Sequence, residues 1–213
     1  MREFFLFLLL LLLFIESCSL KKEEVKIISK SKCDELAFKI KNSKPDDDKY
    51  KIAGIIRGKG LLYAIFRGYI NSNSKISFYT PFGKKIYSIE SLNKDILCIK
   101  SNKDLICADK NKVFKILLKI DLPNSLKLKD LILGNFDIAD TNSYVCEDNK
   151  IIFINKDREY IYSTDGKIEN LKFDRFLIKY NWENSKEYPT LIKIYENGKY
   201  KLKLKIKSLK KVK

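Results

Sequence analysis

Cysteines and acidic residues are the side chains that could do chemistry in this chain, because histidine is absent from all 213 residues. Without histidine, Ser-His-Asp catalysis, Cys-His catalysis and every histidine-based metal site are excluded. The five cysteines include no Cys-x-x-Cys pair, so neither a zinc ribbon nor a thioredoxin-type redox pair is indicated. The run Asp46-Asp47-Asp48 lacks an EF-hand pattern and is interpreted as a solvated linker rather than a cation site. We therefore predict no enzyme, no metal site and no cofactor.

The first cysteine closes an N-terminal apolar segment. Met1-Arg2-Glu3 precedes an unbroken apolar run from Phe4 to Ile15, and Glu16-Ser17-Cys18 follows it. The run is too short to span a bilayer as a helix and has the length of a signal-peptide core. Its end resembles a bacterial lipobox, from which Glu16 departs. The resemblance implies that residues 1–17 are a lipoprotein signal peptide and that Cys18 is lipidated; the alternative is an uncleaved N-terminal anchor.

Four further cysteines remain for an exported chain, in which disulfides can form. Cys98 and Cys107 flank a turn sequence, and a two-residue loop at Asn102-Lys103 places them directly opposite each other on two strands. We predict a disulfide between Cys98 and Cys107, with two half-buried thiols as the alternative. Cys33 and Cys146 are then left over.

The formal charge of +16 comes mainly from lysine, since only five of the 43 basic residues are arginine. Specific readers of bases and phosphates favour the bidentate arginine fork, so a nucleic-acid partner is not predicted. The simplest interpretation is a solvated lysine surface. The alternative is a surface that attracts anionic lipid or an acidic partner.

Three segments have helical periodicity. Residues 20–42 place Val25, Ile28, Leu36 and Ile40 on one stripe with Cys33. Residues 111–119 and 125–133 are also amphipathic, Pro123 separates them, and Gly134 is placed to end the second.

The remaining segments are short, rich in Ile, Tyr and Phe, and separated by turn residues, which predicts an antiparallel meander. The expected strands are 51–57, 61–70, 75–80, 84–91, 95–100, 104–109, 143–147, 151–154, 159–163, 168–181, 190–195 and 200–207. For the last hairpin, keeping apolar residues opposite each other favours a three-residue loop, Glu196-Asn197-Gly198, which pairs Ile194 with Tyr200.

A sheet of about a dozen strands must twist, and it then closes, splits or wraps. The amphipathic helices need an apolar face to cover. Both needs are met by an α+β fold in which an antiparallel sheet curls into an unclosed β-barrel, with helices covering its apolar concave face. That body could hold an apolar ligand; the alternative is a sandwich without a cavity. We expect a lipid anchor, helix and linker over residues 18–48 and this domain over residues 49–213.

Several segments, taken in order, resemble LolB of the LolA/LolB lipoprotein-localisation family. They are Lys49–Gly54, Leu62–Phe66, Ile76–Gly83, Leu122–Leu126, Leu131–Gly134, Tyr188–Thr190, Asn197-Gly198 and Leu202–Ile206. The resemblance covers residues 49–206 and implies an unclosed barrel. It also implies a monomeric, non-enzymatic outer-membrane lipoprotein that faces the periplasm, accepts acylated lipoproteins from a LolA-like carrier and inserts them into outer-membrane lipid.

The resemblance gives one hairpin tip a role. Thr80-Pro81-Phe82-Gly83 fits a type I turn with Phe82 at its apex, and the alternative is a Phe82 ring folded back on the sheet. In LolB the matching position is a protruding apolar residue implicated in placing cargo into the membrane. Pro81, Phe82 and Gly83 are therefore expected to form a membrane-insertion tip, with Lys84 and Lys85 contacting head groups. The rival functions are a non-transporting scaffold for envelope assembly and a lysine-rich adhesin for polyanions.

Overall fold

The computed structural model describes residues 29–43, 48–58, 63–71, 73–93, 95–102, 104–123, 126–141 and 143–212. The predicted signal peptide, Cys18, the first part of the predicted N-terminal helix, Asp46 and Asp47 lie outside these ranges. In the part of the chain that is described, no helix combines the length and apolar character needed to cross a bilayer.

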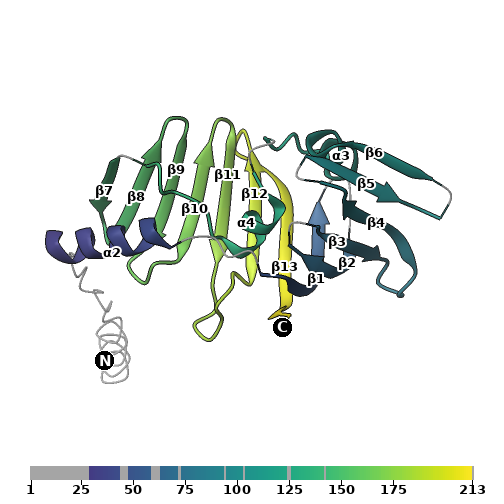
Figure 1. Cartoon of the computed structure of the whole chain (residues 1–213), viewed down its shortest axis with the longest axis horizontal. Coiled ribbons are helices and arrows are strands. Elements are labelled where there is room, and N and C mark those ends of the chain that lie inside the picture. The colour runs from purple at the N-terminus through teal and green to yellow at the C-terminus, as the bar shows by residue number, and fades with distance from the viewer. Residues whose placement is uncertain are drawn as a thin grey trace, which may run out of the picture.

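In the described ranges, thirteen strands form one antiparallel sheet (Figure 1). They are β1 (Tyr50–Gly58), β2 (Ala64–Ile70), β3 (Lys75–Tyr79), β4 (Lys85–Ser91), β5 (Ile96–Lys100), β6 (Leu105–Asp109), β7 (Ser143–Glu147), β8 (Lys150–Asn155), β9 (Arg158–Ser163), β10 (Ile168–Phe173), β11 (Phe176–Asn181), β12 (Leu191–Glu196) and β13 (Lys199–Lys211). The first six strands run outward from β1 to β6, and the last seven run from β13 to β7. Pairing of β1 with β13 joins the two halves.

The sheet is not closed, because β6 and β7 lie at its two ends and do not pair with each other. The apolar face of such a sheet must be buried against other elements. Three helices cover it, α2 (Lys30–Asn42), α3 (Lys110–Leu118) and α4 (Leu128–Leu133). In Figure 1, α2 crosses the strands β8 to β10, α4 lies in front of the middle of the sheet, and α3 lies beside β5 and β6. The predicted fold, an unclosed antiparallel barrel with helices on its concave face, is confirmed.

Strict alternation along β12 and β13 decides which face is buried. Ile192, Ile194, Leu202 and Leu204 are buried, while the lysines between them point to the other face. Successive side chains of a strand point to opposite faces, so one face of these strands is apolar and the other is cationic. The apolar face is the concave one, against which the helices pack.

The segment predicted as one strand from 168 to 181 is two strands, and that prediction was wrong. Asp174 and Arg175 form a two-residue turn, so that Phe173 pairs with Phe176. Asp174 supplies the left-handed conformation that the turn needs, at φ 46°. Aspartate tolerates this region better than most residues, although the segment contains no Asn-Gly or Asp-Gly signal for a turn.

The predicted register of the last hairpin was also wrong. The loop has two residues, Asn197 and Gly198, both with positive φ, and Glu196 pairs with Lys199. A β-bulge then shifts the register, so that Ile194 faces Leu202 instead of Tyr200. The requirement that apolar residues face each other is met by the bulge and not by a longer loop.

Candidate functional site

An apolar hollow lies between the concave face of the sheet and the helices α3 and α4. All of its walls are apolar side chains, namely Ile56, Phe66, Ile76, Phe78, Ile89, Phe114, Leu118, Leu122, Leu128, Leu131, Ile132, Ile194, Leu202 and Leu204. Its volume is about 50 Å³, against roughly 300–1,000 Å³ for sites that hold a drug-sized ligand. The hollow is therefore closed in this conformation, because side chains of the helical segment fill the space that a hydrocarbon chain would need.

The cover of this hollow is formed by residues 119–123 and 126–134, which include α4 and which we call the cover segment. Its side chains Leu122, Leu126, Leu131 and Ile132 are buried against the sheet. Helix α4 has only six residues and no side-chain cap at its start. So short a helix has little stability of its own. The cover segment is consequently held in place by its apolar contacts with the sheet and by contacts at its rim.

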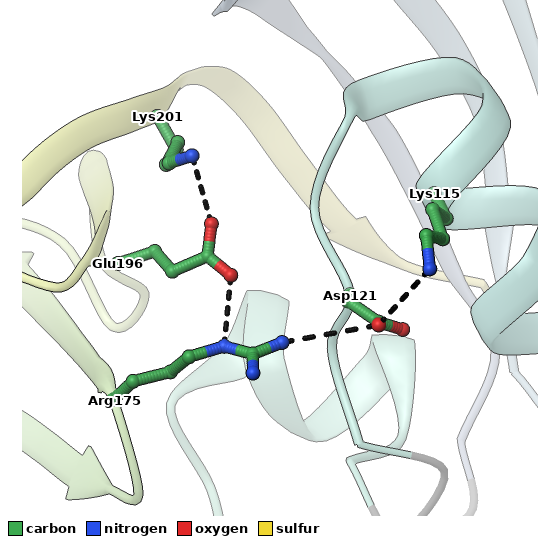
Figure 2. Close-up of polar contacts among 5 residues, drawn as sticks. All are labelled: Lys115, Asp121, Arg175, Glu196 and Lys201. Atoms are coloured by element: carbon green, nitrogen blue, oxygen red, sulfur yellow. Dashed lines mark hydrogen bonds and ion pairs between the residues drawn. The ribbon is translucent and has the colours of Figure 1, made fainter.

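A chain of ion pairs connects the cover segment to the rim of the sheet (Figure 2). Arg175 Nε donates to Glu196 Oε1 at 2.9 Å, and its Nη2 lies 3.8 Å from Asp121 Oδ2 in the cover segment. Lys201 Nζ lies 2.8 Å from the other Glu196 oxygen, and Lys115 Nζ lies 3.4 Å from Asp121 Oδ2. Arg175 thus bridges a carboxylate of the sheet and one of the cover segment.

Glu196 is the most enclosed carboxylate of this rim chain, with its side chain 14% exposed. The hydrogen bond from Lys201, together with the positive charges of Lys201 and Arg175, lowers the pKa of Glu196, against a smaller opposing effect of burial. Glu196 is therefore ionised at neutral pH. The ion pairs with Lys201 and Arg175 hold the Glu196 carboxylate in place. The pair with Glu196 in turn positions the Arg175 guanidinium toward Asp121.

Two tyrosine hydroxyls are buried without a hydrogen-bond partner among the described residues, those of Tyr87 and Tyr180. Burial raises the pKa of both phenols well above the ordinary value of 10. Tyr87 stacks on Phe78, a wall residue of the hollow, with the ring centroids 4.8 Å apart. An unsatisfied hydroxyl in an apolar interior is costly, so each of these two hydroxyls lowers the stability of the protein for as long as it has no partner.

The hairpin between β3 and β4 projects an apolar side chain into solvent. The amide of Gly83 donates to the carbonyl of Thr80 at 3.0 Å, which closes the turn, and Gly83 has φ 83°. Phe82 at the apex is 98% exposed, so its ring is not folded back onto the sheet. Pro81, Lys84 and Lys85 beside it are also exposed. The predicted shape of the tip is thus present; its role in a membrane stays a prediction.

A second, open hollow of about 440 Å³ lies at the end of the sheet opposite the Phe82 tip. Its lining is mostly polar and includes Asp165, Lys167, Glu169 and Lys179, with Trp182 as the largest ring. The indole of Trp182 is committed, since its Nε1 donates to the carbonyl of Ile168 at 2.7 Å and Lys167 lies over its ring. This polar hollow is unsuited to a hydrocarbon ligand.

The four described cysteines are joined in two disulfides in the structure. Cys98 and Cys107 lie directly opposite each other on β5 and β6, in the register predicted from the two-residue loop. The second bond joins Cys33 of α2 to Cys146 of β7. Lys41 adds a hydrogen bond from α2 to the carbonyl of Thr141. The Cys33–Cys146 disulfide and the Lys41 hydrogen bond together hold α2 at the open edge of the sheet. Within the described ranges no group of three His, Cys, Asp or Glu side chains could hold a metal ion.

Sequence reasoning did not identify the rim residues Asp121, Arg175 and Glu196. Each is an ordinary charged residue next to a turn, and nothing local singles it out. The available signal was that Arg175 is one of only five arginines. Which carboxylates it reaches depends on the strand order and on the path of the cover segment.

No protein-family model matches the chain, and no curated protein matches it by sequence. Among solved structures, a LolA-superfamily protein of Nitrosomonas europaea aligns over 85% of this chain and 94% of its own, with 13% identity and a TM-score of 0.48. A Vibrio parahaemolyticus domain named for outer-membrane lipoprotein sorting aligns over 83% of this chain and 91% of its own, with 9% identity and a TM-score of 0.52. At such identity the second likeness is one of fold. The chain is therefore similar in fold to this lipoprotein-sorting domain.

Proposed function

We propose that this protein is an outer-membrane lipoprotein, anchored through Cys18 and facing the periplasm, that receives acylated lipoproteins from a LolA-like carrier and inserts them into outer-membrane lipid. The observation that carries the proposal is the all-apolar hollow under a short, weakly held cover segment. The fold, shared with a domain named for lipoprotein sorting, supports it. The protein acts as a monomer and performs no covalent chemistry.

Acyl chains enter by displacing the cover segment. Uncovering its four buried Leu and Ile side chains costs about 6–12 kcal/mol, at roughly 1.5–3 kcal/mol each. Burying an acyl chain of about 14 methylenes returns roughly 11 kcal/mol, at ~0.8 kcal/mol per CH₂. The two quantities are close, so the exchange of cover side chains for an acyl chain is readily reversible. Reversibility is what a protein that passes its cargo onward needs.

The tip supplies the exit step. An apolar ring that is almost fully exposed on a hairpin can enter the acyl region of a bilayer, while Lys84 and Lys85 meet the head groups. Insertion of Phe82 would bring the protein against the membrane into which the cargo passes. The tip therefore matters for release and not for uptake.

Uptake is tested with the delipidated full-length protein and a synthetic diacylated or triacylated lipopeptide. Native mass spectrometry should show a complex with the lipopeptide and none with the same peptide lacking acyl chains. The Phe82→Glu variant should bind the lipopeptide as well as wild type but transfer it to vesicles at least tenfold more slowly. Absence of lipopeptide uptake by the wild type would contradict the proposal.

The second candidate function is a scaffold lipoprotein for envelope assembly that keeps the fold and carries nothing. The small volume of the hollow, about 50 Å³, favours it. The two functions differ in one measurement, because a scaffold takes up no lipopeptide even at high concentration.

A further inference from the structure

Four cations form a row across the convex face of the sheet. Lys179 of β11 pairs with Lys193 of β12, Lys193 pairs with Lys203 of β13, and Lys203 pairs with Arg57 of β1. Their neighbours along these strands, including Ile178, Ile192, Leu202 and Ile56, are buried on the concave side. Because side chains alternate between faces, the four cations all point outward from the convex face.

The four cations of this row are not neutralised by ion pairs in the part of the chain that is described, although Lys179 shares the lining of the polar hollow with Asp165 and Glu169 and lies over the ring of Tyr195. Among the described residues, none of the four makes an ion pair, whereas Lys172 and Lys75 elsewhere in the sheet pair with Glu159 and Glu90. Like charges directly opposite each other on adjacent strands destabilise a sheet. A merely solvated surface would be more stable with alternating signs. The row therefore concentrates positive charge, over about 14 Å at ~4.8 Å per strand, at a cost in stability.

The composition of the row selects the kind of anion. Three of its four members are lysine, whose compact charge on a flexible stem suits mobile anions without a fixed geometry, while bidentate recognition favours arginine. The exposed Lys205 extends the row along β13. Protein interfaces are depleted of lysine and carry an apolar centre, which this row lacks. These features fit the head groups of an anionic bilayer better than an acidic protein surface.

The Arg57 end of the row supports this choice. Strand pairing places Arg57, at the end of β1, toward the same end of the sheet as the turn that follows Tyr79 and carries Phe82. Tyr200, 41% exposed, contacts the carbonyl of Arg57 through its hydroxyl, and amphipathic rings beside cations are typical of a membrane interface. We propose that the cation row Lys179–Lys193–Lys203–Arg57 docks the convex face on anionic phospholipid. This docking surface is separate from the apolar hollow, whose lining includes none of the four cations, and does not depend on cargo transfer.

Lysine footprinting tests the proposal on the full-length chain. The protein is reconstituted into vesicles of phosphatidylcholine alone or with about one third phosphatidylglycerol and acetylated briefly. In the anionic vesicles, acetylation of Lys179, Lys193 and Lys203 should fall several-fold and recover at high salt. Lys112 and Lys127, which are exposed on the helical side of the sheet, serve as controls and should be labelled equally in both. Equal labelling of the row in both vesicles would overturn the proposal.

A charge-matched pair of double variants gives a second readout. Lys193→Gln with Lys203→Gln should weaken binding to anionic vesicles roughly 30-fold, at about fivefold per lysine near the surface, and should raise the melting temperature. Lys112→Gln with Lys127→Gln should leave binding unchanged. Because the first variant relieves repulsion, misfolding does not mimic the result. Equal loss from both variants would contradict the proposal.

Two further outcomes separate the alternatives. In the first, the lysines of the row are protected from acetylation when polyglutamate is added to neutral vesicles, but not by phosphatidylglycerol at the same concentration of negative charge. That result would indicate an acidic protein partner and would reject the lipid assignment. Lipopeptide uptake by the double variant reports on the proposed function alone. Normal lipopeptide uptake together with lost binding to anionic vesicles supports lipid docking through the cation row. Lost lipopeptide uptake, with the lysines of the row still protected in anionic vesicles, supports lipid docking and contradicts cargo transfer.

Discussion

Arg175 Nη2 lies 3.8 Å from Asp121 Oδ2, and this contact joins the turn between β10 and β11 to the segment that covers the apolar hollow. The same guanidinium donates to Glu196 through Nε. Arg175 is thus positioned by the sheet and reaches across to the cover. The contact is partly exposed, so its strength is modest, and it can break when the cover moves.

Removing this bridge should loosen the cover segment selectively. Arg175→Met is expected to lower the free energy of unfolding by about 1 kcal/mol, which is the scale of partly exposed ion pairs. Hydrogen exchange over residues 119–134 should accelerate more than exchange in β12 or β13. Lys75→Met is the matched control, because it removes an exposed ion pair with Glu90 far from the cover. Equal acceleration in both variants would show that the rim chain does not hold the cover.

Acid should weaken the rim chain. The pKa of Glu196 is lowered in the folded protein, chiefly by its hydrogen bond with Lys201. A lowered pKa contributes stability that is complete above the ordinary value of 4.5 and is lost as the pH falls through the folded value. Urea unfolding measured from pH 7 down to pH 3 should therefore show a smaller acid-induced loss in Glu196→Gln than in wild type. Identical pH profiles would contradict the assignment.

The tip residue should matter for membranes and not for folding. Phe82 is 98% exposed, so Phe82→Glu is expected to change the free energy of unfolding by no more than about 0.5 kcal/mol. Transfer of lipopeptide to vesicles should nevertheless slow at least tenfold. Leu92→Glu replaces another exposed apolar residue, in the turn between β4 and β5 at the other end of the sheet, and should leave transfer unchanged. Slowing by both variants would point to general charge repulsion.

The two disulfides should contribute unequally to stability. They close loops with sequence separations of 113 for Cys33–Cys146 and 9 for Cys98–Cys107. The chain-entropy model gives about 5 kcal/mol for the long loop and about 3 kcal/mol for the short one. Chemical unfolding of the two double Cys→Ser variants should show the larger loss for Cys33 and Cys146. Non-reducing peptide mapping that finds the cysteines free in the exported protein would contradict both pairings.

The buried hydroxyl of Tyr180 should cost stability in the empty protein. Removing an unpaired buried polar group is favourable, so Tyr180→Phe is expected to raise the free energy of unfolding by about 1 kcal/mol. Tyr160→Phe, at a buried tyrosine whose hydroxyl is not among these unpartnered groups, is the comparison and should not stabilise. Thermal unfolding of both variants measures the difference. A loss of stability in Tyr180→Phe would mean that the hydroxyl has a partner, such as a bound water.

Local pattern was enough to predict much of this protein. The alternation of lysine with Leu and Ile along β13, the turn between Cys98 and Cys107 and the end of α4 at Gly134 all depend on near neighbours in the chain. Side-chain periodicity, turn chemistry and the left-handed conformation of glycine act over a few residues, so they can be read from the sequence. The number of strands and the amphipathic helices predicted a curled sheet with helices on its apolar face, with a sandwich without a cavity as the alternative, and the structure decided between the two.

Tertiary structure decided the contacts between segments that are distant in the chain. The split at Asp174-Arg175 and the bulge that pairs Ile194 with Leu202 depend on which neighbouring strands the sheet offers. The bridge from Arg175 to Asp121 and the row from Lys179 to Arg57 exist only because β13 pairs with β1 and the cover segment crosses the concave face. The sequence alone determined which faces are apolar and which are charged, since side-chain chemistry fixes that. The strand order decided which apolar faces pack against each other and which charged residues become neighbours, because burial of apolar surface is a property of the whole sheet.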